Sequence, residues 1–211
     1  ELSGLDAAFL YAETSTMPMN VVGTIILDAA NAAVPCSYER ILRLVEDRLP
    51  RMEPLRRRLA RVAFDFEHPV WIEDSEVRVE RHLRHIQAPA PGSDRVLAEL
   101  VGRIAERPLD RSRPLWQLSV LEGLEGGRVA LVMKLHHALA DGMACAELLL
   151  RLLDLSPEPG PRDDAGEVRP VERPPSGIEV LGDALSRFAR RPARIVRLLS
   201  DAGRSTAAVA R

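Results

Sequence analysis

Short apolar segments with strand character alternate with amphipathic helical segments along most of the chain, and this alternation limits the fold more than any other feature. Asn20–Asp28 is rich in β-branched residues and is followed by a turn, which predicts a buried strand. Ser37 and Ser93 are suited to cap two helices whose apolar residues recur at helical spacing. Residues 115–121 and 128–135 are two further apolar strands, joined by a glycine-rich loop. This order of elements predicts an α/β or α+β sandwich.

A change of composition at residue 157 divides the chain into three parts. Residues 1–156 carry the alternating pattern and are expected to form an N-terminal lobe. Prolines make up six of the 19 residues in 157–175, so 157–176 is predicted to be an extended linker. Residues 177–211 have apolar residues at helical spacing and seven arginines against three acidic residues. They are expected to form basic amphipathic helices, and their net charge of +4 favours an anionic partner surface.

The composition of the 211-residue chain excludes several classes of protein. With 46% hydrophobic residues, the chain can form a core. The two cysteines, Cys36 and Cys145, are too few for a disulfide scaffold or a four-cysteine zinc site. No apolar run reaches ~18 residues and the first residues do not resemble a signal peptide, so we expect a cytoplasmic protein. Lys134 is the only lysine among 29 basic residues, a bias typical of a GC-rich bacterium.

The segment HHALADG, residues 136–142, carries the candidate chemistry. It follows the apolar strand 128–135 and precedes an apolar helix predicted at 143–155, so the fold can hold its side chains rigidly. A neutral imidazole can accept a proton near neutral pH. Adjacent histidines in extended backbone point in opposite directions, so one can face a substrate while the other packs inward. We expect Asp141 to hold the loop and Gly142 to permit a turn.

Other readings of these residues remain open at this stage. Two adjacent histidines are often purely structural, and zinc needs three or four ligands, which this pair does not supply. His82 and His85 lie in an arginine-rich stretch and are expected on the solvated surface. Cys145 could pair with a histidine as a nucleophile, but a cysteine in an apolar helix is usually a small core residue.

The segment HHALADG resembles the HHxxxDG signature of coenzyme A-dependent acyltransferases, such as chloramphenicol acetyltransferase, and of peptide-synthetase condensation domains. Further segments, in the same order along the chain, resemble the bacterial wax ester synthase/diacylglycerol acyltransferase family. They are LDAAFL (5–10), PM (18–19), VERHLRH (79–85), PAPG (89–92), PLD (108–110), PLW (114–116) and LEGL (121–124).

The resemblance implies one lobe of a two-lobe, chloramphenicol acetyltransferase-like fold with a mixed sheet and flanking helices. It implies that His137 is the general base for transfer of a fatty acyl group from acyl-CoA to diacylglycerol or a long-chain alcohol. It assigns His136 a supporting role and Asp141 the orientation of the loop, with no metal and no cofactor besides acyl-CoA as co-substrate. Pro114, Leu115 and Trp116 would brace the neighbouring strand, or serve only as core packing.

The resemblance covers only the first lobe and departs from the family at Asn20, where many relatives have histidine. We therefore expect a C-terminal lobe, in the same polypeptide or a separate chain, as a partner. Peripheral contact with the inner membrane or lipid inclusions is expected, and nucleic acid is not, because aromatic residues are only 4% of the chain. The alternatives are another HHxxxDG acyltransferase or condensation enzyme, and a non-catalytic lobe that binds lipid surfaces.

Overall fold

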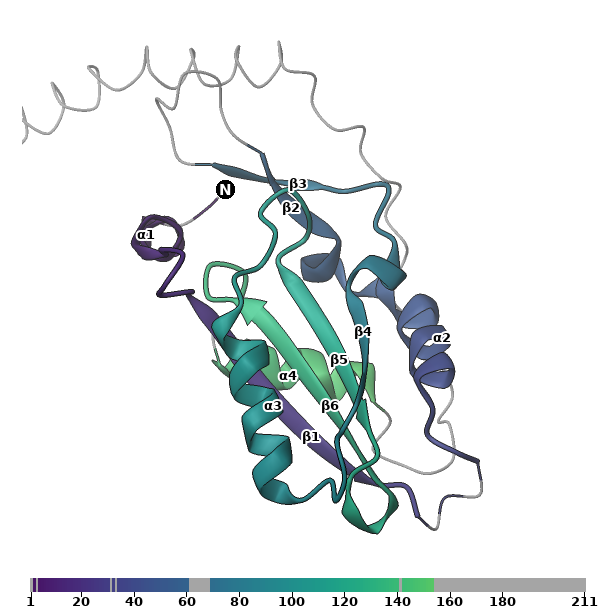
Figure 1. Ribbon diagram of the computed structural model, residues 1–211. Helices are drawn as coiled ribbons and strands as arrows, with labels where there is room; N and C mark the ends of the chain where they lie inside the picture. Colours follow the sequence, from purple (N-terminus) through teal and green to yellow (C-terminus); the bar gives the residue numbers. More distant parts are fainter. Residues whose placement is uncertain are drawn as a thin grey trace, which may run out of the picture.

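The computed structural model describes residues 2, 4–30, 32, 34–60, 69–140 and 142–153 (Figure 1). The predicted linker, the predicted basic helices and Asp141 lie outside these described residues. None of the described helices is both long and apolar enough to cross a bilayer.

A four-stranded mixed sheet forms the centre of the described chain. Its order is β1 (Asn20–Asp28), β6 (Arg128–His136), β5 (Trp116–Glu122) and β4 (Leu83–Gln87). β6 pairs antiparallel with both β1 and β5, whereas β4 and β5 are parallel. The predicted hairpin of β5 and β6 is confirmed. The two strands are buried along almost their whole length, which explains why their sequences are apolar runs rather than alternating patterns.

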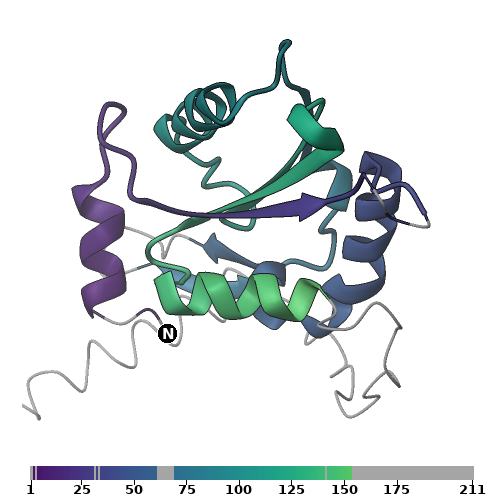
Figure 2. The same cartoon turned by 90° about the horizontal axis from the view of Figure 1, so that it is seen from below.

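Helices cover both faces of the sheet (Figure 2). α3 (Asp94–Glu106) lies on one face, α4 (Gly142–Leu152) and α2 (Tyr38–Arg48) lie on the other, and α1 (Gly4–Ala12) stands beside the start of β1. The predicted cap of α2 is confirmed, because the Ser37 side chain accepts a hydrogen bond from the backbone N–H of Arg40. The predicted sandwich with a mixed sheet and flanking helices is therefore present.

Shorter elements connect these layers. α2 is followed by the 3₁₀ turns η1 (Leu49–Arg51) and η2 (Glu53–Arg56). β2 (Arg57–Ala60) and β3 (Val70–Glu73) pair antiparallel as a separate two-stranded sheet. The remaining 3₁₀ turns are η4 (Val79–Arg81), before β4, and η5 (Glu125–Gly127), between β5 and β6.

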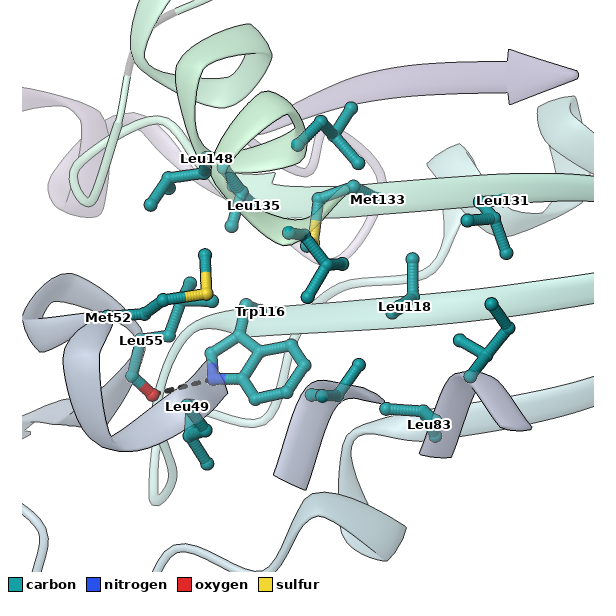
Figure 3. Close-up of a cluster of buried hydrophobic side chains, with 14 of the residues drawn as sticks. Leu49, Met52, Leu55, Leu83, Trp116, Leu118, Leu131, Met133, Leu135 and Leu148 are labelled. Carbon is teal, nitrogen blue, oxygen red and sulfur yellow. Dashed lines mark hydrogen bonds between the residues drawn. The ribbon is translucent and has the colours of Figure 1, made fainter. Parts of the chain in front are cut away.

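The larger part of the core fills the space between the sheet, α2 and α4 (Figure 3). At one end of it, the buried Trp116 donates its indole N–H to the backbone carbonyl of Leu55 at 2.7 Å. The labelled side chains of this cluster are Leu49, Met52, Leu55, Leu83, Trp116, Leu118, Leu131, Met133, Leu135 and Leu148. A second, smaller cluster joins the opposite face of the sheet to α3.

The prediction that the helix after the histidines is largely buried is only partly right. α4 ends at Leu152, and its buried residues are Cys145, Leu148, Leu149 and Leu152. Met143 and Leu150 are 82% and 54% exposed, because only one face of the helix packs on the sheet. The packing is close: a Cβ on Gly23 of β1 would lie 2.9 Å from the Cδ1 atom of Leu149.

Candidate active site

The two histidines lie where β6 ends and the chain turns towards α4. The N–H of His136 donates to the carbonyl of Leu115 at 3.0 Å, and the N–H of His137 donates to the carbonyl of Met19 at 2.7 Å. The carbonyl of His136 accepts the N–H of Leu139 at 2.8 Å and thereby closes the turn. The backbone of both histidines is thus held by segments from three parts of the chain.

The side chain of His136 is fully buried. Its Nδ1 atom accepts the N–H of Ala138 at 3.0 Å, so the proton of the neutral ring resides on Nε2. Nε2 lies 3.5 Å from Oε1 of Glu13, which is longer than a normal hydrogen bond, and has no other polar partner among the described residues. Burial lowers the pKa of His136 and the Glu13 carboxylate opposes this shift. The balance favours a neutral ring.

The side chain of His137, the first residue of the turn after β6, is partly exposed, in contrast to the buried side chain of His136. Its ring stacks on Phe9 of α1, with ring centroids 4.2 Å apart and an angle of 14° between the planes. Stacking occupies a face of the imidazole and leaves the ring nitrogens at its edge. The arrangement orients a group that can accept a proton.

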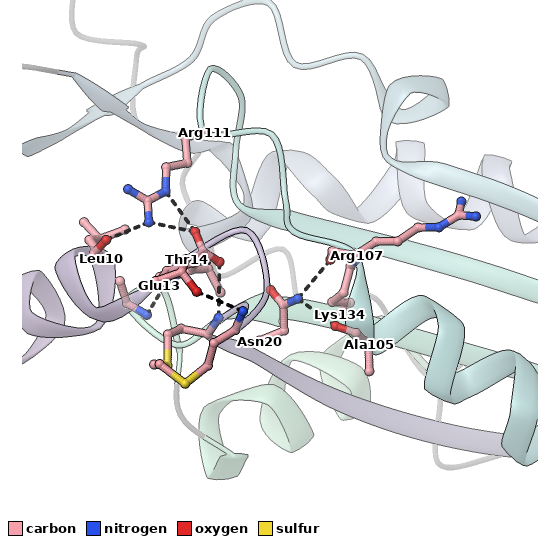
Figure 4. A network of polar contacts seen from close by, with 12 residues as sticks. Leu10, Glu13, Thr14, Asn20, Ala105, Arg107, Arg111 and Lys134 are labelled. Atoms are coloured by element: carbon pink, nitrogen blue, oxygen red, sulfur yellow. Dashed lines mark hydrogen bonds and ion pairs between the residues drawn. The ribbon is translucent and has the colours of Figure 1, made fainter.

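The sequence did not predict an ion pair between the buried Glu13, which faces His136, and the partly exposed Arg111 (Figure 4). Nε and Nη2 of Arg111 donate to Oε2 of Glu13 at 3.0 and 2.7 Å, and Nη2 also donates to the carbonyl of Leu10 at 2.6 Å. The other oxygen of Glu13 accepts the N–H of Met19 at 3.2 Å. No local pattern reveals a pair separated by 98 positions.

The segment Pro114–Trp116 joins the histidines to the core. The carbonyl of Leu115 holds the N–H of His136, and the indole of Trp116 reaches the first 3₁₀ turns after α2 through Leu55. Leu115 and Trp116 therefore contact the strand that ends at His136, and both are also fully buried in the core, so the contacts fit either predicted role.

The prediction that Gly142 is needed for a backbone turn is wrong. Gly142 begins α4, its φ lies outside the left-handed region, and a Cβ there would meet no atom within 4 Å. Neither a left-handed turn nor a close approach requires glycine at this position. Asp141, the predicted loop-orienting residue, lies outside the described residues.

The surface prediction is wrong for His82 and confirmed for His85. The ring of His82 is buried, stacks on Trp116 with centroids 4.3 Å apart, and Nδ1 contacts the Trp116 carbonyl at 2.9 Å. Burial lowers the pKa of His82. The side chain of His85 is 44% exposed and lies 2.7 Å from the carboxylate of Glu122. The arginine-rich sequence concealed that His82 lies directly before β4, an edge strand of the sheet, where its ring packs on Trp116 of the neighbouring β5.

Asn20 and Lys134 both bind the end of α3 (Figure 4). Nδ2 of Asn20 donates to the carbonyls of Ala105 and Arg107, both at 3.0 Å. Nζ of Lys134 donates to the carbonyls of Ile104 and Arg107, both at 2.9 Å. Together the two side chains satisfy backbone groups that a helix end leaves unpaired, which gives Asn20 a structural role.

The remaining candidates do not form a second reactive site. Cys145 is 1% exposed and packs at the interface of α4 and β1, where burial raises its pKa, as expected for a core cysteine. Within the described residues, no three His, Cys, Asp or Glu side chains are grouped closely enough to hold a metal ion.

The sheet, its flanking helices and the histidine pair define one lobe of an HHxxxDG-type fold. The first condensation domain of the calcium-dependent antibiotic synthetase has the same fold, with a TM-score of 0.57 and 17% identity over 72% of this chain and 35% of that one. The wax ester synthase/diacylglycerol acyltransferase from Marinobacter aquaeolei VT8 matches with a TM-score of 0.59 and 30% identity, over 71% of this chain and 37% of that one.

Sequence comparison is more specific than the fold. Residues 2–211 match the wax ester synthase/diacylglycerol acyltransferase catalytic domain, and the chain belongs to this family. A putative diacylglycerol O-acyltransferase of Mycobacterium tuberculosis is 40% identical over 197 residues, which cover 92% of this chain and 38% of that protein. A probable diacylglycerol O-acyltransferase, tgs3, of the same species is 34% identical over all of this chain and 81% of its own length. The chain thus spans little more than a third of the first relative.

Proposed function

We propose that this chain is the histidine-bearing lobe of an acyl-CoA-dependent O-acyltransferase. The acceptor is diacylglycerol or a long-chain alcohol, and the products are triacylglycerol or wax esters. The observation that carries the proposal is the pair of histidines at the end of β6, of which His136 is buried and His137 is partly exposed with its ring fixed against Phe9. The substrate class follows from the relatives, which are named as diacylglycerol acyltransferases and wax ester synthases.

In the proposed reaction, His137 removes the proton from the acceptor hydroxyl as its oxygen attacks the carbonyl carbon of the thioester. The tetrahedral intermediate collapses, the carbon–sulfur bond breaks, and the protonated His137 returns the proton to the CoA thiolate. An ester and free CoA leave, and no covalent acyl-enzyme forms. General base catalysis of this kind contributes ~10²–10⁴-fold to the rate.

The buried His136 supports this role in two ways. Its backbone and ring hold the turn, so the ring of His137 keeps one position as the proton moves. Because burial favours the neutral form of His136, the adjacent ring does not add a positive charge that would oppose protonation of His137.

We further propose that activity needs a second region. In the longer relatives, this region lies beyond the part that matches residues 2–211 of this chain. The chain covers 38% of the length of one such relative. Groups that stabilise the developing oxyanion and complete the two substrate channels would come from that part. Contact with a lipid surface through the arginine-rich residues 177–211 would bring the enzyme to substrates that do not dissolve in water.

The test is acyl transfer by the natural protein, supplied with the complementary lobe of a full-length relative, from palmitoyl-CoA to either dioleoylglycerol or hexadecanol. Transfer is measured as release of free CoA thiol and as ester product. Thiol release that depends on the acceptor and is abolished by His137→Ala supports the proposal. The proposal is overturned if the folded protein binds anionic vesicles but releases no thiol with either acceptor. That result would identify a non-catalytic lipid-binding lobe.

A further inference from the structure

We propose that Glu13 is a positioning residue that holds both histidines of the candidate active site in place. The inference rests on the proposed function for its kinetic consequences. It adds to that function a residue of the N-terminal segment that the HHxxxDG motif does not include.

Glu13 is almost completely buried, with 6% of its side chain exposed. Its two oxygens divide their contacts: Oε2 receives two N–H groups of Arg111, while Oε1 receives the N–H of Met19 and faces Nε2 of His136. A buried carboxylate is tolerated only when it is paired and hydrogen-bonded. Among the described residues, the groups that contact its oxygens are the N–H groups of Arg111 and Met19 and the Nε2 atom of His136, which carries the ring proton. The site is therefore built for a carboxylate.

The first set of contacts joins the Glu13 carboxylate to the ring of His136. The turn requires Nδ1 to accept the N–H of Ala138, which leaves the ring proton on Nε2, 3.5 Å from Oε1 of Glu13. Among the described residues, Nε2 has no hydrogen-bond partner, and Glu13 is the carboxylate that it faces. The negative charge favours the tautomer that carries its proton on this side, and so favours the closed turn.

The second set of contacts joins Glu13 to the backbone of His137 through Met19. Met19 donates its N–H to Glu13 at 3.2 Å and accepts the N–H of His137 at 2.7 Å. A single residue thus links the carboxylate to the peptide group of the proposed base. A shift of Glu13 would pass directly to His137 through this link.

Glu13 also secures the Phe9 ring that stacks on His137, through its backbone N–H and through its ion pair with Arg111. The N–H of Glu13 donates to the carbonyl of Phe9 at 3.2 Å, and Arg111 binds both Glu13 and the carbonyl of Leu10. These contacts fix the end of α1, and with it the Phe9 ring 4.2 Å from the ring of His137. The first set of contacts thus positions His136, and the other two position His137.

The donors on both sides of the Glu13 side chain suit a glutamate but not a glutamine. In Glu13→Gln the amide has one oxygen and one NH₂ group, but both sides of the side chain face donors. If the oxygen faces Arg111, the NH₂ group opposes the N–H of Met19 and Nε2–H of His136, and the other orientation opposes Arg111. Glu13→Asp keeps two acceptors and the charge, although it is shorter by one methylene.

The experiment compares kcat and KM of the natural protein with those of Glu13→Gln, Glu13→Asp and Arg111→Lys. Glu99→Gln is the matched control, because Glu99 pairs with Arg95 at 2.7 Å on the exposed side of α3. We expect Glu13→Gln to lower kcat by ~10–100-fold per folded molecule, since small displacements of a catalytic group have such effects, with KM changed much less. Glu13→Asp should recover part of this loss, and Glu99→Gln should behave as the natural protein.

A second measurement does not depend on activity. In the natural protein labelled with ¹⁵N-histidine, NMR should find His136 as the Nε2–H tautomer, and Glu13→Gln should weaken or abolish this preference. A purely structural Glu13 would lower the amount of folded protein while leaving kcat per folded molecule and the tautomer unchanged, and that result overturns the proposal. If Glu13→Gln does not fold, Glu13→Asp and Arg111→Lys are held to the same two criteria.

The two proposals fail in different ways. If the natural protein transfers no acyl group, or if His137→Ala retains full turnover, the proposed function fails and the tautomer measurement still decides whether Glu13 positions His136. If His137→Ala is inactive but Glu13→Gln matches Glu99→Gln in kcat and in tautomer, the function stands and the role of Glu13 is refuted.

Discussion

The indole N–H of Trp116 donates to the backbone carbonyl of Leu55 at 2.7 Å and thereby ties β5 to the 3₁₀ turns after α2. Trp116→Phe keeps a large aromatic ring in the core but leaves this buried carbonyl without its donor. We expect a loss of about 1–3 kcal/mol in the free energy of unfolding, measured by urea denaturation of the natural protein. A loss below about 0.5 kcal/mol would show that the hydrogen bond contributes little beyond the packing of the ring.

His137→Ala is expected to separate activity from stability. Removal of the proposed base should reduce turnover by ~10²-fold or more, while the free energy of unfolding stays within about 1 kcal/mol, because the side chain is only partly buried.

His136→Ala is the matched comparison. This ring is fully buried and accepts the N–H of Ala138, so its loss should lower stability by about 2–4 kcal/mol and reduce activity through the turn. Equal losses of stability in the two variants, without a difference in turnover, would favour two purely structural histidines.

Lowering the pH below 6.5 should destabilise the protein through His82 and His136. Burial lowers the pKa of both below this ordinary value, so between the lowered pKa and 6.5 the unfolded chain binds more protons than the folded one. Stability is therefore fully present above 6.5 and falls as the pH drops, by up to about 1.4 kcal/mol per pH unit for each histidine. His82→Gln removes one of these protons, so its denaturation midpoints should have a shallower slope against pH. Identical slopes would contradict the shift assigned to His82.

Lys134→Met tests the charged group that binds the end of α3. The change leaves the carbonyl of Ile104 without its donor, and we expect a loss of about 1–3 kcal/mol at pH 7. Burial, with smaller effects from Arg107 and Arg84, lowers the pKa of Lys134 from 10.5 to about 8. Between these values the unfolded state binds the extra proton, so the stability of the natural protein should rise with pH relative to Lys134→Met. A constant difference from pH 8 to pH 10 would contradict this shift.

Residues 1–211 alone are expected to show negligible acyl transfer. Loss of a single oxyanion donor costs ~10²–10³-fold, and we place such donors outside this region. Supplying the remaining part of a full-length relative in trans should restore measurable thiol release, and His137→Ala in the same mixture is the control. Full turnover by residues 1–211 would refute the proposed need for a second lobe.

Local sequence patterns were enough to predict the features that depend on residues close together in the chain. The strand at Asn20–Asp28, the cap at Ser37 and the position of the histidines between β6 and α4 follow from residue periodicity and capping chemistry within about ten positions. The expected burial of that strand is wrong, because β1 lies at the edge of the sheet and none of its residues is buried. The expectation that one histidine of the pair packs inward while the other stays accessible agrees with the buried His136 and the partly exposed His137.

Only the tertiary structure decided which distant groups meet. The sequence placed His82 on the surface because its neighbours are arginines, but the start of β4 packs this ring against Trp116. α4 is apolar on most sides, yet its contact with β1 buries one face and exposes Met143. Glu13 and Arg111 lie 98 positions apart and become partners beside His136 because α1 docks at the end of the sheet. Side-chain periodicity reports the burial of a local face, whereas the pairing of charges depends on how whole elements pack, and no local pattern encodes that packing.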